Sequence, residues 1–200
     1  MAKTEHRWFA YMWENRLSKQ EAMRPWREYT AGRARGRVLE VGIGNGASIP
    51  YYRGIDELIG VEPDPAMRRY AEPRAKEAPF PVRLVAGEAQ HLPLADDSVD
   101  VVVSNLVYCT IPDVDAALGE VARVLKPGGE FRFFEHVRAS GNIAGRLQDA
   151  VTPLWSWFGA GCHPNRRIED AIRRAGFDIV EIERFRAGLP HIAGLARPPA

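Results

Sequence analysis

Three glycines, Gly42, Gly44 and Gly46, alternate with other residues directly after an apolar run. Glycine lets the chain turn tightly and lets backbone N–H groups approach a ligand. A helix following such a turn would offer unpaired N–H groups and a positive dipole end, which stabilise a carboxylate or a pyrophosphate. The loop therefore predicts a site for an anionic group. A plain strand-to-helix turn is the alternative, and the glycines alone do not choose between the two ligands.

An acidic residue accompanies each of three successive predicted strand ends. Glu40 would repel a pyrophosphate but could orient a cationic amino group, and the G-x-G-x-G spacing differs from the dinucleotide fingerprint G-x-G-x-x-G. A nicotinamide enzyme is therefore disfavoured. Glu62 lies about 20 residues beyond the loop, where an acid can hold both ribose hydroxyls. A solvated surface glutamate is the alternative for Glu62. Glu88, in the turn formed by Gly87, Glu88 and Ala89, could accept from an adenine amino group.

A second group of reactive side chains follows the later strands. His136 lies at the expected ligand-binding edge and is the leading candidate for a catalytic base, with a packed or surface histidine equally compatible. Glu135 would point to the opposite face of the strand and could anchor a helix or orient a neighbour. A substrate pocket is predicted to be lined by Tyr108, Cys109, Trp155 and His163, of which His163 is a weaker second base.

From residue 38 onward, short apolar runs alternate with longer amphipathic stretches, which is typical of β–α units that build a parallel sheet. The nearly continuous apolar run at 99–103 predicts a central strand covered on both faces. The connection at 186–190 suits a hairpin, so the last strand should be antiparallel. The expected strands are 38–41, 58–61, 82–86, 99–104, 130–137, 177–183 and 191–196.

Two of the predicted helices have clear start signals. Asp113 is a plausible N-cap for a helix over 113–125, and an acidic cap and a proline begin another over 64–78, which Pro73 should kink or split. Residues 143–158 and 166–175 are expected to form two more. The aromatic-rich preamble and the Trp155 and Trp157 segment could close over a small hydrophobic substrate, so replacing either tryptophan with alanine should raise the substrate KM.

The composition predicts one domain, because 200 residues with 46% hydrophobic positions can bury a single core. We expect a helical cap over 1–36, a ligand-binding core over 37–138, and substrate-side helices with a hairpin over 139–200. The formal net charge of +1 favours a small-molecule substrate over nucleic acid or an anionic membrane. The oligomeric state cannot be read from the sequence.

The N-terminal apolar stretch is interrupted by Glu14 and Arg16, so we expect neither a signal peptide nor a membrane-spanning helix, and a cytoplasmic protein. The only two cysteines, Cys109 and Cys162, lie too far apart in sequence for a metal-type CxxC pair. A disulfide framework would normally use more cysteines. We therefore expect two reduced thiols and no metal.

Four motifs resemble the class I S-adenosylmethionine-dependent methyltransferases: EVGIGNG, GVEPDP, GEAQHLPLADDSVDVVVS and RVLKPGG. The resemblance covers residues 37–138. It implies a Rossmann-like α/β fold with helices on both faces of a mostly parallel seven-stranded sheet, in the order 3-2-1-4-5-7-6 with the last strand antiparallel. It also implies S-adenosylmethionine as cofactor. Ile43 and Glu88 depart from the small residue or cysteine and the aspartate that are usual at these positions.

The resemblance also implies a role for each matched position. The methionine end of the cofactor would be held by Glu40, Gly42, Gly44 and Gly46, the ribose by Glu62 and Pro63, and the adenine by Gly87, Glu88 and Ala89. Asn105 would bind the amino group through its backbone. Methyl transfer would then be a direct in-line displacement, which does not require a dedicated base, and S-adenosylhomocysteine would be the product.

A narrower similarity lies in residues 16–20, 105–111, 134–137 and 155–162. These segments resemble the methyltransferase-like thiol S-methyltransferases, whose animal members have an N-terminal membrane anchor and methylate small alkyl thiols. We expect no anchor here, and a thiol as the methyl acceptor. Methylation of oxygen, nitrogen or carbon in a small aromatic or quinone-like metabolite stays open, as does a cofactor-binding protein without turnover.

Overall fold

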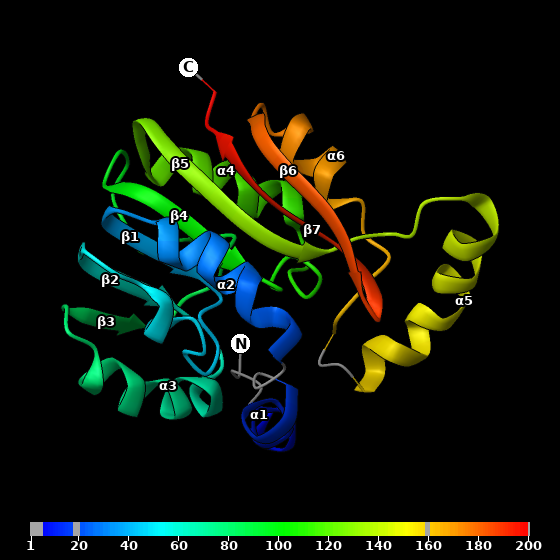
Figure 1. Cartoon of the computed structure of the whole chain (residues 1–200), viewed down its shortest axis with the longest axis horizontal. Coiled ribbons are helices and arrows are strands. Elements are labelled where there is room, and N and C mark those ends of the chain that lie inside the picture. The colour runs from blue at the N-terminus through cyan, green and yellow to red at the C-terminus, as the bar shows by residue number, and fades with distance from the viewer. Residues whose placement is uncertain (1–5, 18–20, 159–160, 200) are drawn as a thin grey trace.

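A seven-stranded sheet forms the centre of the protein in a computed structural model that describes residues 6–17, 21–158 and 161–199 (Figure 1). Its strand order is β3-β2-β1-β4-β5-β7-β6, and β7 is antiparallel to both β5 and β6 while the other pairs are parallel. The predicted order and the antiparallel last strand are confirmed. The strands are β1 Gly36–Val41, β2 Ile55–Val61, β3 Val82–Val85, β4 Val99–Asn105, β5 Leu125–His136, β6 Asp178–Ala187 and β7 Leu189–Arg197.

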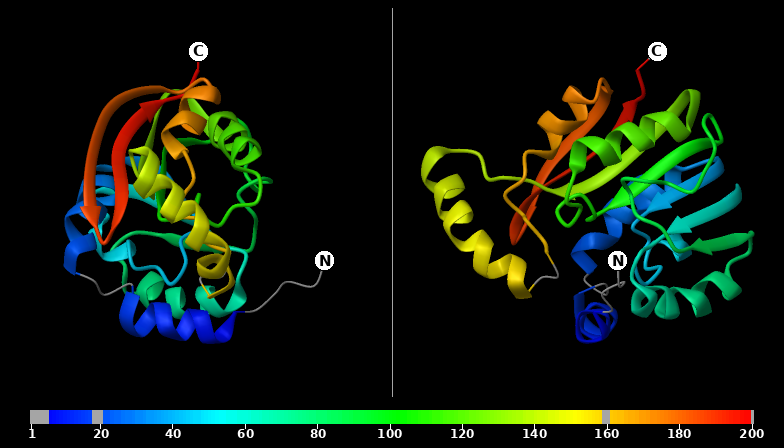
Figure 2. Two further views of the ribbon diagram at one scale, coloured as in Figure 1. Left: turned by 90° about the vertical axis from the view of Figure 1, so that its right-hand side faces the viewer. Right: turned by 180° about the vertical axis from the view of Figure 1, so that it is seen from behind.

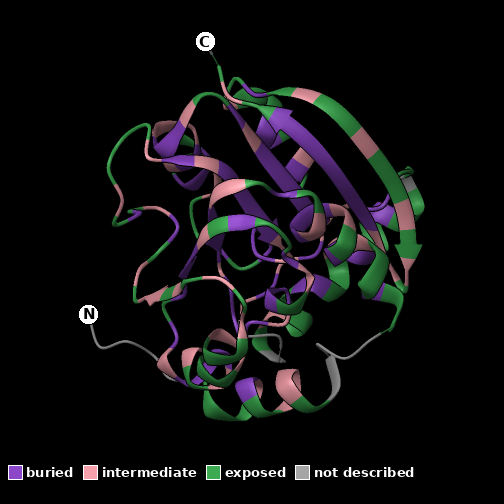
Figure 3. Cartoon of the chain, turned by 60° about the vertical axis from the view of Figure 1, so that its left-hand side comes forward, coloured by how far each residue is buried: buried purple, intermediate pink, exposed green. Residues whose placement is uncertain are grey.

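The side chains of β4 alternate between two apolar clusters, one on each face of the sheet. Val102 packs with the cluster that includes α4 (Val114–Val124) and α6 (Ile168–Arg174), whereas Val101 and Val103 pack with the other. α4 and α6 lie together behind the sheet in Figure 1, and α2 (Arg24–Thr30) crosses its front. The prediction of a central strand buried on both faces is confirmed. In Figure 3, β7 is buried along most of its length, while the edge strand β6 alternates between exposed and half-buried residues.

The predicted helix caps are present. The side chain of Asp113 accepts a hydrogen bond from the Ala116 N–H at 3.0 Å and starts α4, and Asp64 does the same for Ala66 at 2.7 Å and starts α3 (Pro65–Glu77). The expectation that Pro73 would split α3 is wrong. Pro73 lies on the exposed side of this helix, where water can replace the N–H donor that proline lacks.

The α-helix expected directly after the glycine loop is also absent. The chain there forms only a three-residue 3₁₀ helix, Ile49–Tyr51, because β2 already begins at Ile55 and leaves too few residues for a longer helix. A helix dipole therefore cannot supply the positive potential that the loop predicted.

Several strand boundaries differ from the predictions, among them the start of β2 at Ile55 and not at 58. β5 begins at Leu125 and not at 130, with an irregularity in its pairing to β4 between Val99 and Val101. The β6–β7 hairpin turns at Gly188, whose φ of +76° is easy only for glycine. Its turn is tighter than expected, because Arg186 and Pro190 already pair across the two strands.

Two helical regions flank the sheet on the side where β1, β4 and β5 end (Figure 2). The N-terminal region consists of α1 (Arg7–Met12), a π-helical turn (Trp13–Leu17), a 3₁₀ turn (Glu21–Met23), α2 and a second 3₁₀ turn (Ala31–Arg33). Residues 1–5 and 18–20, which belong to the predicted cap and, in part, to the 16–20 motif, lie outside the described residues.

The second region is α5 (Asn142–Phe158), which stands away from the sheet (Figure 2). Its apolar side chains are largely exposed, including Trp155 at 51% and Trp157 at 78%, so it does not close over the sheet as the predicted lid would. Within the described parts of the chain, no helix combines the length and apolar character needed to cross a membrane.

Candidate active site

The glycine loop after β1 depends on its glycines for steric reasons. Gly42, Gly44 and Gly46 have φ values of +61°, +59° and +75°, a region that side chains disfavour. A Cβ atom on Gly42 would lie 2.6 Å from Cγ1 of Val107, in the loop after β4. The backbone of the two loops can therefore pack this closely only with glycine at this position.

Glu62 directly follows β2 and reaches back to this loop. Its carboxylate accepts hydrogen bonds from the Gly44 N–H at 3.1 Å and the Asp64 N–H at 2.9 Å. Burial raises the pKa of Glu62 to about 7, although these hydrogen bonds oppose the shift. The structure thus brings together two positions that are 18 residues apart in sequence.

Glu40 is a buried carboxylate at the end of β1, with only 1% of its surface exposed. It accepts from the Tyr52 hydroxyl at 2.9 Å and from the Asn105 side-chain amide at 3.2 Å. Burial raises its pKa to about 7 against these hydrogen bonds. Asn105 also accepts from the Thr30 hydroxyl at 2.8 Å, so its side chain, and not only its backbone, connects β4, α2 and Glu40.

Sequence reasoning missed Arg27, a buried cation of α2. It interacts electrostatically with Glu40 and Tyr51, and burial lowers its pKa. No local motif marks this arginine, because it approaches Glu40 only after the N-terminal region has folded back against β1. Arg27 supplies at this edge the positive charge that the missing helix does not.

The third predicted loop is more open. Glu88 is exposed and pairs through its backbone with His91 in an isolated bridge, whereas Ala89 is buried in the main apolar cluster. Gly87 lies close to Val61 and Pro93. Pro63, between Glu62 and Asp64, is exposed. The ends of β1 and β2, together with the glycine loop at residues 42–46, form a region that we call the glycine edge.

The ends of β4 and β5, with residues 105–111, form a second region that we call the sulfur edge. Leu106 has a φ of +61°, which is a strained conformation for a leucine. Glu135 holds this loop in place by accepting from the Val107 N–H at 2.9 Å, the Tyr108 N–H at 3.1 Å and the Ser104 hydroxyl at 2.9 Å. Burial raises the pKa of Glu135 to about 8. We expected Glu135 to anchor a helix or to orient a neighbour. In the structure it anchors the loop after β4.

His136 ends β5 and is half-buried. Its ring centroid lies 4.6 Å from that of His191 on β7, a residue the sequence did not single out. Burial lowers the pKa of His191 to about 4, so this neighbour is neutral. Nδ1 of His136 is buried and, among the described residues, has no hydrogen-bond partner.

Both cysteines lie beside His136. The sulfurs of Cys109 and Cys162 and a ring nitrogen of His136 are all within 4.8 Å of one another. Neither cysteine forms a disulfide, as predicted. Their mutual hydrogen bond raises the pKa of Cys109 and lowers that of Cys162, which also receives hydrogen bonds from His136 and Trp155.

The other two predicted pocket residues have mainly structural contacts. Tyr108 is fully buried with its ring edge-on to Phe131, and its hydroxyl has no partner in the described part of the chain. The His163 N–H donates to the Cys109 carbonyl at 2.7 Å. Arg166, which sequence reasoning also missed, donates to the carbonyls of Tyr108 and Ile111 and so fastens the same loop.

The chain is similar to known methyltransferases over most of its length. Residues 39–133 match the family described as the methyltransferase domain. The human protein "Thiol S-methyltransferase TMT1A" is 34% identical over 190 residues, which are 89% of this chain and 77% of that protein. The rat protein "Thiol S-methyltransferase TMT1B" is 34% identical over 169 residues, covering 80% of this chain and 69% of the relative. The chain belongs to the class I S-adenosylmethionine-dependent methyltransferases.

A solved structure confirms the fold of this methyltransferase. The crystal structure of the YcgJ protein from Bacillus subtilis superposes with a TM-score of 0.70 and covers 90% of this chain and 98% of that one. At 20% sequence identity, this likeness concerns the fold alone.

The residues of the methyltransferase's glycine edge fit S-adenosylmethionine. Gly44 has a positive φ, and a Cβ atom there would lie 3.3 Å from Met67, so glycine lets this buried loop pack closely against α3 without a side chain. Glu40 and Glu62 are buried acids with raised pKa values, so an ammonium group or hydroxyl donors would stabilise their charged forms. The chemistry of this edge therefore suits the methionine end and the ribose of the cofactor.

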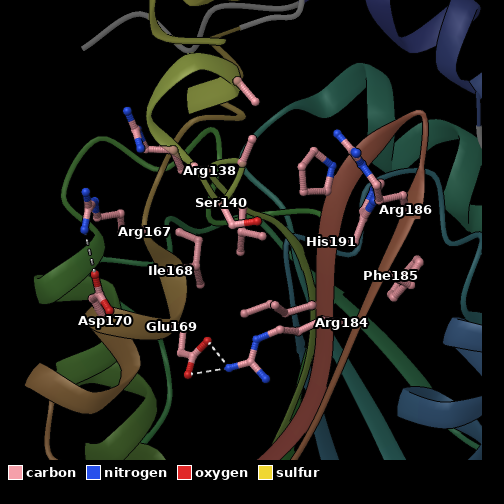
Figure 4. Close-up of a pocket in the computed structure, with 16 residues that line it drawn as sticks. Arg138, Ser140, Arg167, Ile168, Glu169, Asp170, Arg184, Phe185, Arg186 and His191 are labelled. Atoms are coloured by element: carbon pink, nitrogen blue, oxygen red, sulfur yellow. Dashed lines mark hydrogen bonds and ion pairs between the residues drawn. The ribbon is translucent and has the colours of Figure 1, made fainter. Parts of the chain in front are cut away.

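A separate pocket of about 580 Å³ lies beyond β5, between the start of α6 and the β6–β7 hairpin (Figure 4). Three of its arginines are held by nearby acids. Arg184 pairs with Glu169 at 2.7 Å, Arg167 with Asp170 at 3.7 Å, and Arg138 with Asp149 at 2.8 Å. It contains none of the predicted cofactor residues, but it includes His191, which packs against His136.

Proposed function

We propose that this methyltransferase transfers the methyl group of S-adenosylmethionine to the sulfur of a small hydrophobic thiol. The observation that carries this proposal is the 34% identity, over 89% of the chain, to a protein named as a thiol S-methyltransferase. The sulfur edge supports the choice of a hydrophobic acceptor. Residues 106–111 carry no charged side chain, and Val107, Tyr108, Cys109 and Ile111 are buried, so an acceptor would be bound by burial and not by ion pairing.

The glycine edge holds the cofactor in this proposal. When bound, S-adenosylmethionine supplies a methyl group on a sulfonium centre. Glu40 and the backbone of Asn105 hold the ammonium end, and Arg27 supplies the charge that attracts the carboxylate, in place of a helix dipole. Glu62 and Pro63 hold the ribose, and Gly87, Glu88 and Ala89 hold the adenine.

The N-terminal region closes the glycine edge in the same proposal. The Glu14 carboxylate accepts from the Asn45 side-chain amide at 2.6 Å and from Arg74 at 2.7 Å, so the π-helical turn is fastened to the glycine loop and to α3. The His6 N–H donates to Asp64 at 3.0 Å. These contacts support the division into a cap over 1–36, a cofactor core over 37–138 and an acceptor side over 139–200.

Methyl transfer needs little from the protein beyond position. The acceptor sulfur attacks in line with the bond that breaks, at roughly 3 Å, and exclusion of water from the pair contributes to the rate. A free thiol has a pKa near about 8.5, and the thiolate is the reactive form. His136 is the side chain that this proposal places against the acceptor, to promote loss of its proton. Tyr108, Cys109, Trp155 and His163 surround it.

Two unpaired cysteines, Cys109 and Cys162, support the reducing, cytoplasmic location that forms part of this proposal. The formal net charge of the protein is +1, which fits a small-molecule acceptor and not nucleic acid.

A matched acceptor panel tests the proposal. The protein would be incubated with S-adenosylmethionine and with alkyl thiols, phenols, amines and quinols of similar size, and both S-adenosylhomocysteine and the methylated product would be quantified by mass spectrometry. We expect the highest kcat/KM with hydrophobic thiols, rising with chain length. A phenol or an amine that outperforms every thiol would overturn sulfur as the acceptor. If the cofactor binds but no acceptor yields S-adenosylhomocysteine, the proposal that the protein catalyses methyl transfer is overturned.

A further inference from the structure

Three side chains from distant parts of the sequence meet at the sulfur edge. Cys109 lies in the loop after β4, His136 ends β5, and Cys162 lies between α5 and α6. Their sulfurs and a ring nitrogen all lie within 4.8 Å of one another. Two cysteines and one histidine are ligand types that select Zn²⁺ over the hard cations Mg²⁺ and Ca²⁺. The geometry points to a zinc-binding site formed by Cys109, His136 and Cys162.

The spacing of the three atoms suits this ion. Zinc lies about 2.3 Å from sulfur and about 2.0 Å from nitrogen, so ligand atoms around a tetrahedral ion are roughly 3.3 to 3.8 Å apart. With a largest separation of 4.8 Å, the donors need to approach by about 1.5 Å at most. Rotation of the side chains can contribute that movement, because the donor atoms already lie this close together while their backbones come from β5, the loop after β4 and the connection between α5 and α6.

The surroundings also suit a cation. Cys109 and Cys162 are buried next to each other, and a cation bound between them would offset the repulsion of the two thiolates that bind it. Arg166 interacts electrostatically with both sulfurs, but it contributes a single positive charge. The side chain of Trp155 hydrogen-bonds Cys162, and the Leu106 carbonyl lies 3.7 Å from the Cys109 sulfur, so groups outside the cluster orient both sulfurs.

The site has three protein ligands. No fourth His, Cys, Asp or Glu joins the cluster among the residues that the structure describes. Zinc sites that keep a position for substrate have three protein ligands, whereas closed structural sites have four. His136 is half-buried while both cysteines are buried, so a further ligand would reach the ion on the side of the histidine.

The fourth position would take the acceptor sulfur, a step that rests on the proposed function. The thiol binds as a thiolate and releases its proton to solvent, so His136 would promote this loss as a ligand of the ion and not as a base. A lone pair of that sulfur forms the new bond to the methyl carbon. The bond from the methyl carbon to the sulfonium sulfur breaks, and its electron pair stays on that sulfur, which yields S-adenosylhomocysteine. The neutral thioether is a poorer ligand than the thiolate and is released.

Cobalt titration of the whole chain tests the site directly. Reduced, metal-free protein would be titrated with Co²⁺ and then with Zn²⁺ under anaerobic conditions. We expect one equivalent of Co²⁺ to give the visible absorption of a tetrahedral ion together with a thiolate-to-metal charge-transfer band, and one equivalent of Zn²⁺ to abolish both. Since the chain has only two cysteines, that band can arise only from Cys109 and Cys162. A wild-type protein that binds no cobalt, or binds it without a thiolate band, would overturn the site.

Variants assign the ligands. Cys162→Ser and His136→Ala should each weaken metal binding by about a hundredfold or more, since losing a direct ligand costs at least as much as losing its supporting partner. His91→Ala removes an exposed histidine and should leave binding unchanged. Binding that survives Cys162→Ser would contradict the assignment, and the wild-type titration decides the matter even where a variant fails to fold.

The acceptor panel separates this inference from the proposed function. Full thiol methylation by protein that takes up no metal would overturn the zinc site and leave thiol methylation supported. Zinc uptake by a protein that methylates only phenols or amines would support the site and overturn the thiol acceptor.

Discussion

The glycine edge and the sulfur edge differ in how their buried polar groups are paired. At the glycine edge, Glu40 and Glu62 each accept hydrogen bonds from groups of the protein itself. At the sulfur edge, Tyr108 and His136 each have a buried polar atom without a partner within the described residues, and so does His191 on the neighbouring strand β7. Unpaired buried groups cost free energy, which is tolerated where a ligand later satisfies them.

The two edges also differ in how they are enclosed. The N-terminal region is fastened over the glycine edge through Glu14 and Asn45. Beside the sulfur edge, α5 exposes a row of apolar side chains, among them Ile143, Leu147 and Trp155. In the proposed function, the glycine edge is then a preformed cofactor site, and the sulfur edge is an acceptor site that is completed by its ligands. Each prediction below tests one side of this contrast.

The largest effect is expected at Glu135, which fixes the backbone of the sulfur edge. Glu135→Ala would leave the N–H groups of Val107 and Tyr108 and the Ser104 hydroxyl without their acceptor. Since each buried unsatisfied donor costs about 1 to 3 kcal/mol, the free energy of unfolding should fall by at least about 3 kcal/mol. Urea denaturation measures this loss.

Glu135→Gln is the matched control, because its side-chain carbonyl can still accept from the loop. It should retain more than half of the stability that Glu135→Ala loses. If the two variants were equally stable, the carboxylate would not be the anchor of this loop, and the sulfur edge would have to be held by Arg166 alone.

A smaller effect is expected where the two edges touch, at Gly42 and Val107. Gly42→Ala places a Cβ atom 2.6 Å from Val107 at a φ of +61°. Gly54→Ala provides the control, since Gly54 has a φ of +62° but no atom within 4 Å of the added Cβ. The control should lose about 1 kcal/mol from its backbone conformation. Gly42→Ala should lose about 1 to 2 kcal/mol more from overpacking and bind S-adenosylmethionine at least about tenfold more weakly.

Thermal unfolding and calorimetry with the cofactor measure both quantities for this pair of variants. Equal losses in the two proteins would mean that Val107 moves aside freely, and that the glycine edge is not sterically coupled to the sulfur edge.

The sequence predicts the glycine edge well because its information is local. Gly42, Gly44 and Gly46 lie within five residues, and Glu62 directly follows an apolar strand, so strand ends and turn chemistry suffice to place them. The alternation of elements predicts a mostly parallel sheet, whereas the strand order is implied only by the resemblance of the motifs. Arg27 is the exception, because its position depends on how the preamble packs against Glu40.

The sulfur edge was predicted less completely because its contacts are long-range. Cys109 and Cys162 are 53 positions apart, and only the return of the chain after α5 brings them together. The packing of His191 on His136 requires the register between β5 and β7, which alternation does not fix. Trp155 and Trp157 have the composition of a core or a lid, and sequence alone cannot show that α5 leaves them exposed.

Cofactor binding at the glycine edge should depend on pH. Burial raises the pKa values of Glu40 and Glu62 to about 7, and an ammonium group or a hydroxyl donor binds the charged carboxylate better. Cofactor affinity should therefore fall between pH 8 and pH 6, by about tenfold for each carboxylate that must lose its proton. Calorimetry across this range measures the slope.

The stability of the cofactor-free protein should change in the opposite sense. An acid with a folded pKa of about 7 and an unfolded pKa near about 4.5 keeps its proton longer in the native state, so these groups favour unfolding increasingly as the pH rises from 4.5 to 7. Glu40→Gln should weaken both dependences, and Glu72→Gln, at an exposed acid of α3 outside the proposed cofactor residues, should leave both unchanged. An affinity that is flat from pH 6 to pH 8 would exclude a direct role for either buried carboxylate.

The smallest effect is expected from the tryptophans of α5. Trp155 hydrogen-bonds Cys162, whereas Trp157 is 78% exposed, so the two should not contribute equally to acceptor binding. Trp155→Ala should raise the acceptor KM by roughly three- to tenfold with little change in kcat, because it removes ground-state and transition-state binding alike. Trp157→Ala should change KM by less than about twofold. Equal increases in both variants, measured by steady-state kinetics with a hydrophobic thiol, would show instead that α5 swings in and covers the acceptor with its whole apolar face.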